Sequence, residues 1–243
     1  MIRTCLVLAW WTFWTLLNAT WGIAHMFLTG NANALYRVAL WGALVGAKMG
    51  GAHIEIRGRE NIRDGQNYIF MSNHVSNLDP PILIPLIPVR TSVLVKKELF
   101  RIPLLGTAMK LASLVPVDRS NREAAIASIR EATLVLQKGL HMTVFPEGTR
   151  SSDGRLHPLK KGPFYLAEES GVPVIPVTIR GTYEMWPKGR FAMNPGKVVL
   201  TYHPPVTFAD AGSREALMAA VRKAIESALP EEMRSTETEA DEI

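Results

Sequence analysis

The sequence is poor in cysteine. Cys5 is the single cysteine among 243 residues, so no intramolecular disulfide can form, and the low usage argues against an oxidising compartment. Cys5 also lies in a hydrophobic N-terminal stretch, where a thiol is poorly placed to act as a nucleophile. A disulfide-stapled fold is therefore excluded, and cysteine catalysis is disfavoured.

Two other kinds of site have no signature in the sequence. The chain lacks a Gly-x-Ser-x-Gly motif, which disfavours a serine nucleophile. Its six histidines show no paired spacing of the kind that binds a metal ion. They are His25, His53, His74, His141, His157 and His203. We therefore expect no metal site.

Acidic residues are scarce outside the C-terminus. The formal net charge is +5, but residues 231–243 contain six acids and one arginine, so residues 1–230 carry 26 basic and 16 acidic side chains, a net of +10. A basic surface suits anionic lipids or phosphate-bearing ligands. Nucleic acid is disfavoured because no basic helix, zinc spacing or aromatic RNA-binding signature occurs. We expect the acidic tail, residues 231–243, to be disordered.

Charge is also nearly absent from the N-terminus. Residues 4–36 contain no lysine, arginine or acid, and include Trp10, Trp11, Trp14 and Trp21. At helical spacing, one face of this stretch is apolar and includes Leu6, Trp10 and Trp21. The opposite face, which includes Asn18 and Gly22, is expected to contact water; it is called the wet side below. Residues 30–33 predict a turn, and residues 34–49 a second apolar helix.

These two helices predict a membrane-anchoring unit over residues 1–50. Tryptophan favours the headgroup region, so the Trp-bearing face is expected to hold a helical hairpin in one leaflet. A single membrane span is the alternative. A cleaved signal peptide is disfavoured because no small-x-small cleavage site follows at the right distance.

Residues 51–230 alternate strand-like and helix-like segments. Strands are predicted at residues 53–57, 68–71, 92–96, 113–117, 141–145, 174–180 and 197–203. Helices are predicted at residues 163–170, at residues 213–228, and from a Ser120/Glu123 capping box to residue 138. The alternation predicts an α/β domain whose mixed sheet is covered by helices on both faces.

One histidine and one carboxylate follow the second predicted strand. In Asn73-His74-Val75-Ser76-Asn77-Leu78-Asp79 they are five positions apart. A neutral imidazole can accept a proton from a hydroxyl near pH 7, and a carboxylate on its other nitrogen fixes the tautomer. Asp79 also precedes two prolines, so an alternative interpretation makes it a helix N-cap. The two interpretations are compatible.

A second polar loop, Pro146-Glu147-Gly148-Thr149-Arg150-Ser151, follows the strand predicted at residues 141–145. Open α/β sheets bind ligands in the loops at the carboxyl ends of their strands. A surface turn with a salt-bridged arginine is the alternative.

Together these residues resemble the glycerolipid acyltransferase family, in particular the 1-acyl-sn-glycerol-3-phosphate acyltransferases. The family's asparagine-histidine motif, followed by four residues and an aspartate, matches Asn73, His74 and Asp79, and its third motif matches Phe145 to Ser151. The segment ending in Asp118-Arg119 resembles the second motif, and Val174-Ile175-Pro176-Val177 the fourth. Pro116 is a departure, since members often have a plainer β residue there.

The resemblance implies roles for particular residues. His74 would be the general base and Asp79 its orienting acid. Substrate-binding residues would be Glu147, Gly148, Thr149, Arg150, Lys160 and Arg119, with Arg150 on the acceptor's phosphate and backbone N–H groups near Gly148 facing the oxyanion. Glu147 is expected to accept from the glycerol hydroxyl or to hold Arg150. For Lys160 an exposed turn lysine is the alternative.

The resemblance also implies the reaction and its partners. The acceptor would be lysophosphatidic acid, and the donor acyl-CoA or acyl carrier protein, with no bound cofactor. Membrane lipids would be partners at the cytoplasmic face of the cell membrane. Glycerol 3-phosphate or a phosphate-free lysolipid is the alternative acceptor, and a non-catalytic, basic membrane-binding module is a third hypothesis.

Overall fold

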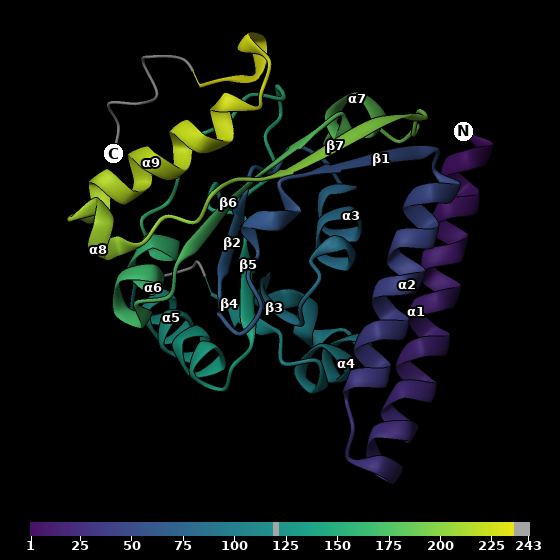
Figure 1. The fold of residues 1–243 in the computed structure, drawn as a ribbon. Helices are drawn as coiled ribbons and strands as arrows, with labels where there is room; N and C mark the ends of the chain where they lie inside the picture. The colour runs from purple at the N-terminus through teal and green to yellow at the C-terminus, as the bar shows by residue number, and fades with distance from the viewer. Residues whose placement is uncertain (119–121, 236–243) are drawn as a thin grey trace.

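Seven strands form one sheet within residues 1–118 and 122–235, which the computed structural model describes. The strands lie in the order β1-β7-β6-β2-β5-β3-β4 (Figure 1). Their bounds are β1 Ala52–Arg57, β2 Ile69–Ser72, β3 Thr91–Lys96, β4 Val115–Val117, β5 His141–Val144, β6 Val174–Arg180 and β7 Gly196–Tyr202. β6 and β7 pair antiparallel, and the other neighbours pair parallel. The predicted mixed sheet is therefore confirmed.

Helices cover both faces of this sheet (Figure 1). One layer contains α5 (Arg122–Gln137), α6 (Gly162–Ser170), α8 (Phe208–Ala211) and α9 (Arg214–Ser227). The other contains α1 (Ile2–Thr29), α2 (Asn33–Met49), α3 (Asp79–Leu86) and α4 (Leu105–Leu111). Short helices Arg59–Asn61, Lys97–Arg101, α7 (Thr182–Met185) and Glu231–Met233 lie in the connections. The prediction that both faces are covered is confirmed.

The central strands β2, β5 and β6 are almost wholly buried, as expected where helices cover both faces of a sheet. In β6, Val174 packs in the core beneath α5, α6 and α9, whereas Ile175, Val177 and Ile179 pack in the core on the α3 side. β2 lies between β5 and β6 and runs parallel to both. The carboxyl ends of these three strands therefore meet at one edge of the sheet, where the polar loops begin.

The strand predicted at residues 113–117 is shorter than expected. Ser113 has a φ of 64°, a left-handed conformation that a strand residue does not adopt, and β4 begins at Val115. Pro116 lies in β4, which is the edge strand, where the missing N–H leaves no gap in the ladder. Ser120 of the predicted capping box lies outside the described residues.

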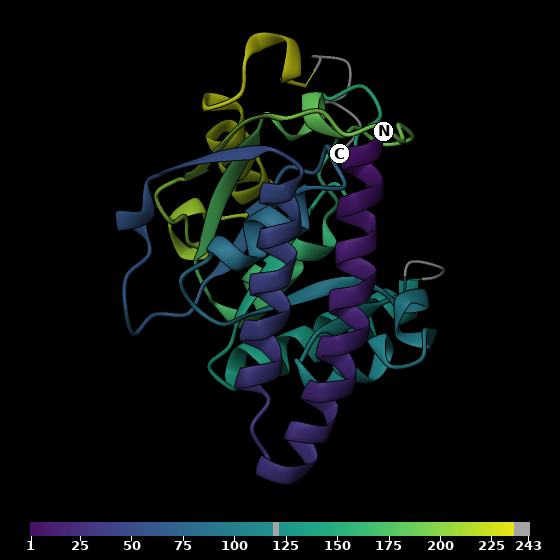
Figure 2. The ribbon, with the colours of Figure 1, turned by 90° about the vertical axis from the view of Figure 1, so that its right-hand side faces the viewer.

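The two N-terminal helices pack side by side as a helical pair, called the hairpin below (Figure 2). Three indole N–H groups of α1 donate to carbonyl oxygens of α2: Trp10 to Gly42 at 2.8 Å, Trp11 to Ala43 at 3.1 Å and Trp14 to Val38 at 3.0 Å. Gly42 and Gly46 allow this approach, since a Cβ atom at either position would collide with an indole ring. These tryptophans therefore join the helices, a role that the headgroup preference of tryptophan did not predict.

The expected wet side of α1 is partly wrong. Asn18 and Gly22 are buried against α2, and the Asn18 amide donates to Leu35 O at 3.4 Å. Apolar side chains point outward instead, with Phe13 58% and Trp41 54% exposed. No helix among the described residues is long and apolar enough to cross a membrane.

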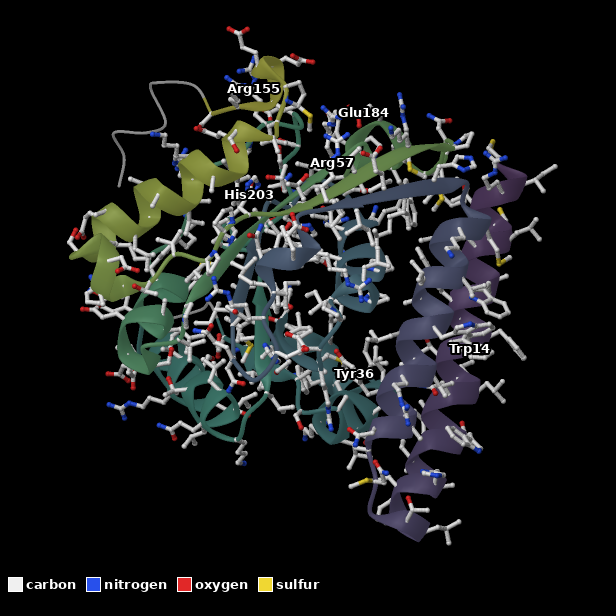
Figure 3. All side chains as sticks on the ribbon, viewed as in Figure 1. Trp14, Tyr36, Arg57, Arg155, Glu184 and His203 are labelled. Atoms are coloured by element: carbon white, nitrogen blue, oxygen red, sulfur yellow. The ribbon has the colours of Figure 1, made fainter. Side chains whose placement is uncertain are left out.

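The hairpin is also part of the domain's core. Val7 and Ala47 are buried in the same apolar cluster as β2, β6 and α3. Tyr36 points from α2 toward the sheet, and its hydroxyl donates to Thr91 O at 3.1 Å (Figure 3). At the C-terminus, residues Glu231–Met233 form a short helix and Met233 is buried, so the prediction that the tail is disordered from residue 231 is wrong for these residues; residues 236–243 lie outside the described residues.

Candidate active site

His74 and Asp79 contact each other directly. His74 Nδ1 lies 2.8 Å from Asp79 Oδ2, and the two side chains are 16% and 0% exposed. The imidazole stacks on Phe145, with ring centroids 4.1 Å apart. His74 Nε2 has no hydrogen-bond partner among the described residues. A carboxylate on Nδ1 and a free Nε2 are the arrangement that a general base requires.

The Asp79 carboxylate accepts four hydrogen bonds. Besides His74, Oδ2 accepts from the N–H groups of Val75 and Ser76, each at 2.7 Å, and Oδ1 accepts from the Thr182 hydroxyl at 2.6 Å. This density of donors offsets the cost of burying a charge. Asp79 is the first residue of α3, which has no side-chain cap. The carboxylate therefore accepts hydrogen bonds from the loop that precedes the helix and does not cap the helix, so the N-cap interpretation is wrong.

The neighbouring asparagine and serine attach this loop to the rest of the domain. Asn73 pairs with the backbone of Ile179, donating to its carbonyl at 2.9 Å and accepting from its N–H at 2.8 Å. The Ser76 hydroxyl donates to Trp186 O at 2.7 Å. Both side chains take the place of a backbone partner where β2 has ended, so they position His74 without facing a substrate.

Glu147 lies beneath the same loop and is 3% exposed. Its Oε1 accepts from the N–H of His74 at 2.6 Å, and its Oε2 accepts from the N–H of His157 at 3.0 Å. Burial raises the pKa of Glu147 to about 8, although the two N–H donors oppose the shift. We expected Glu147 to meet the glycerol hydroxyl or Arg150. Instead, its oxygens fasten the His74 loop to the segment that follows the polar turn.

Arg150 is held by a residue that the sequence analysis did not single out. Its Nη1 donates to Asn77 Oδ1, and Asn77 belongs to the loop between His74 and Asp79. The two residues are 73 positions apart, so no local pattern could pair them. Arg150 is half-buried, and the rest of its guanidinium fork is left for a ligand.

The other predicted binding residues lie in or near this turn. Gly148 has a φ of 77°, and its N–H already donates to Phe145 O at 3.0 Å, which leaves it unable to face an oxyanion. Thr149 and Lys160 are exposed, and the Lys160 N–H donates to Pro146 O at 2.8 Å. Arg119 lies outside the described residues.

A further polar cluster supports the turn. The Ser151 N–H donates to His74 O at 2.8 Å, and the Ser151 hydroxyl donates to Asp153 Oδ1 at 2.7 Å. His157 Nε2 lies 3.0 Å from the same Asp153 oxygen. Although burial opposes the shift, hydrogen bonds from Arg155, Ser151 and His157 lower the pKa of Asp153 to about 2. Ser151 and His157 share one carboxylate oxygen, so the cluster lacks the relay order of a nucleophilic triad.

No group of three metal-ligating side chains occurs among the residues that the structure describes. Fold and site together define an α/β protein that carries a paired histidine and aspartate at the carboxyl edge of its sheet. Comparison with known proteins then gives the family. A family model described as Acyltransferase matches residues 53–180, and the chain belongs to the acyltransferase family.

Individual relatives agree with this result. The 1-acyl-sn-glycerol-3-phosphate acyltransferase of Limnanthes alba is 38% identical over 195 residues, which cover 78% of this chain and 69% of the relative. The 1-acyl-sn-glycerol-3-phosphate acyltransferase alpha of Mus musculus is 33% identical over 159 residues, 65% of this chain and 56% of the relative. The crystal structure of the 1-acyl-sn-glycerophosphate (LPA) acyltransferase PlsC from Thermotoga maritima is also similar. Its TM-score is 0.77 at 31% identity, over 93% of this chain and 94% of that one.

Proposed function

We propose that this protein transfers an acyl group from an acyl thioester to the 2-hydroxyl of 1-acyl-sn-glycerol 3-phosphate, giving phosphatidic acid. The observation that carries the proposal is the His74–Asp79 pair with its free Nε2. The names of the relatives from Limnanthes alba and Mus musculus support this acceptor.

Direct transfer needs one proton acceptor and one proton donor. His74 Nε2 takes the proton of the acceptor hydroxyl while its oxygen attacks the thioester carbonyl. Asp79 stabilises the imidazolium that forms, and the imidazolium returns the proton to the departing thiolate. The products are an ester and a free thiol, so no bound cofactor is required.

Charge on the acceptor's phosphate and on the developing oxyanion requires separate donors. Arg150 can hold the phosphate through the N–H groups that Asn77 does not use, with Lys160 and Arg119 as further candidates. The N–H groups of Thr149 and Arg150 make no hydrogen bond to the described residues. Of the N–H groups near Gly148, we therefore assign the oxyanion to these two amides.

We place the protein at the cytoplasmic face of the cell membrane, with α1 and α2 lying on the lipid. Apolar side chains exposed on the hairpin support contact with lipid, because lipid would remove their apolar surface from water. They include Leu6, Phe13, Leu16, Leu17, Trp21 and Trp41. A lysolipid acceptor keeps its tail in the same leaflet, so an enzyme held there meets its substrate at headgroup depth.

Product analysis tests the proposal. The purified protein is incubated with an acyl-CoA and, in parallel, with lysophosphatidic acid, glycerol 3-phosphate or a lysolipid that has no phosphomonoester, and the products are identified by mass spectrometry. We expect phosphatidic acid from the first acceptor. Preferential acylation of another acceptor would reassign the substrate, and no product above a His74→Ala control would indicate a non-catalytic module.

A further inference from the structure

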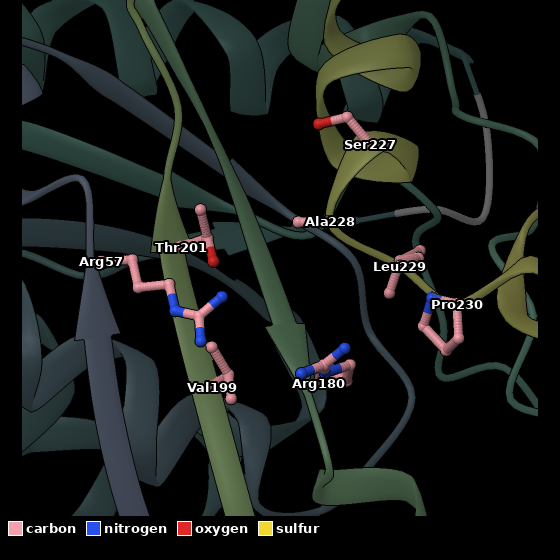
Figure 4. Close-up of a pocket in the computed structure, with 8 residues that line it drawn as sticks. All are labelled: Arg57, Arg180, Val199, Thr201, Ser227, Ala228, Leu229 and Pro230. Atoms are coloured by element: carbon pink, nitrogen blue, oxygen red, sulfur yellow. The ribbon is translucent and has the colours of Figure 1, made fainter.

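A cavity of about 330 Å³ lies on the α9 side of the sheet (Figure 4). Its floor is β7, with Val199 and Thr201, and the segment 227–230 at the end of α9 forms a wall. Arg57 of β1 and Arg180 of β6 line it from the two strands that flank β7. This volume is in the range of pockets that bind small molecules.

The two arginines differ in what they contact. Arg57 bonds to Glu55, with its Nη2 2.6 Å from Oε1, and Lys197 shares this carboxylate at 2.6 Å. Arg180 is half-buried, and its guanidinium makes no hydrogen bond or ion pair with any residue in the described part of the chain. Arg57 and Lys197 therefore share one carboxylate, and the Arg180 guanidinium has its donors unused. A group with several acceptor oxygens and negative charge fits this deficit.

The cavity lies close to the reacting groups, although on the other face of the sheet. Ser72 of β2 pairs with Val177 of β6. His74 follows Ser72 by two residues and Arg180 follows Val177 by three, so both residues lie near the same end of this strand pair. Arg180 is two residues before Thr182, at most about 7 Å of extended chain. The Thr182 hydroxyl bonds to Asp79. Arg57, which lines the cavity, lies away from Trp14 of the hairpin (Figure 3).

We propose that this cavity binds the phosphate at the end of the pantetheine arm of the acyl donor. The inference rests on the proposed function, in which the acceptor's phosphate is held by Arg150 and the donor is the second phosphate-bearing substrate. The pantetheine arm is longer than the two-residue step from Thr182 to Arg180, so it can pass over the sheet edge from the thioester to the cavity. Val199, Leu229 and Pro230 give its apolar parts a surface. Coenzyme A and acyl carrier protein share this phosphate.

Donors with and without the phosphate test the proposal. Arg180→Gln, Arg57→Gln and the double variant of the full chain are compared with the wild type on acyl-CoA, on acyl carrier protein loaded with the same acyl group, and on its N-acetylcysteamine thioester, which has no phosphate. Lys223→Gln is the matched control, because it removes one exposed positive charge from α9 and Lys223 does not line the cavity. Thermal unfolding checks that each variant is folded.

We expect kcat/KM for the phosphate-bearing donors to fall by about tenfold for Arg180→Gln, and further for the double variant, since hydrogen bonds to charged groups are the strong ones. The N-acetylcysteamine thioester should react equally well with all variants. A loss with acyl-CoA alone would assign the cavity to coenzyme A, and a loss with the carrier protein alone would assign it to that donor. Equal losses with all three donors, or none with either phosphate-bearing donor, would overturn the proposal.

Binding separates this inference from the proposed function. Calorimetric titration of free coenzyme A and of the phosphopantetheinylated carrier protein needs no acceptor and no turnover. If the wild type is inactive on lysophosphatidic acid but one of these ligands binds and loses affinity with Arg180→Gln, the cavity assignment holds while the proposed function fails. If neither ligand binds the wild type, the cavity assignment fails by itself.

Discussion

Replacing Asp79 by Asn changes one carboxylate oxygen to an NH₂ group, and this should separate the residue's contribution to stability from its contribution to catalysis. Its carboxylate accepts from His74 Nδ1, from two backbone N–H groups and from the Thr182 hydroxyl. In Asp79→Asn, the amide oxygen can keep the three nitrogen donors while the new NH₂ group faces Thr182, whose hydroxyl rotates to accept. We expect this variant to lose only about 1–2 kcal/mol of unfolding free energy.

Turnover should respond far more. With an effective dielectric constant of about 20, two unit charges at this contact distance attract by roughly 6 kcal/mol. If a third of this is lost in the transition state, about 2 kcal/mol, kcat falls by about thirtyfold. Asp79→Ala, by contrast, leaves four donors without an acceptor and should cost about 4 kcal/mol or more of stability, a large share of the total for a domain.

The assay combines urea denaturation with initial rates of thiol release. The expected order is that Asp79→Asn unfolds close to the wild type but turns over slowly, whereas Asp79→Ala is strongly destabilised. A folded Asp79→Asn enzyme with kcat within about threefold of the wild type would refute the view that the carboxylate charge assists the base.

Three further perturbations follow from the structure. Arg150→Ala should raise KM for lysophosphatidic acid and leave kcat nearly unchanged, and Asn77→Leu should do so to a smaller extent; an equal effect on a phosphate-free acceptor would make Arg150 structural. Burial lowers the pKa of His141 and of His203, so the unfolded chain takes up protons first as the pH falls, and unfolding free energy should drop below about pH 6.5. Replacing both by Gln should flatten that dependence between about pH 5 and 7, and an unchanged slope would contradict the assignment. Gly46→Ala brings a Cβ atom within 2.0 Å of an indole and should lower Tm. Helix propensity alone would instead raise the unfolding free energy by about 1 kcal/mol.

Local patterns predicted the elements whose own sequence carries an apolar run, a cap or a short-range spacing. Residues 174–180 were expected as a strand and form β6. Ser213, expected to open the last helix, caps α9 by accepting from the Ala216 N–H at 3.1 Å. The His74–Asp79 contact followed from five-residue spacing in one loop. In each case the signal lies within a few residues of sequence.

The remaining features depend on partners far along the chain. Thr182 reaches Asp79 across 103 positions, and the contact between Asn77 and Arg150 likewise joins separate loops, so neither leaves a periodic signal. Asn18 was expected to face solvent because it lies on the polar face of the first helix, but the second helix packs on that face. Helix α4 is seven residues long, too short for periodicity to identify.

The central claim is that His74 takes the acceptor's proton, and the most direct measurement is kcat of a folded His74→Ala variant. With saturating acyl-CoA and lysophosphatidic acid, phosphatidic acid formation should fall by at least about a hundredfold, while KM for lysophosphatidic acid stays nearly constant and thermal unfolding confirms an intact domain. A His74→Ala enzyme that is folded and forms phosphatidic acid at close to the wild-type rate would contradict the account.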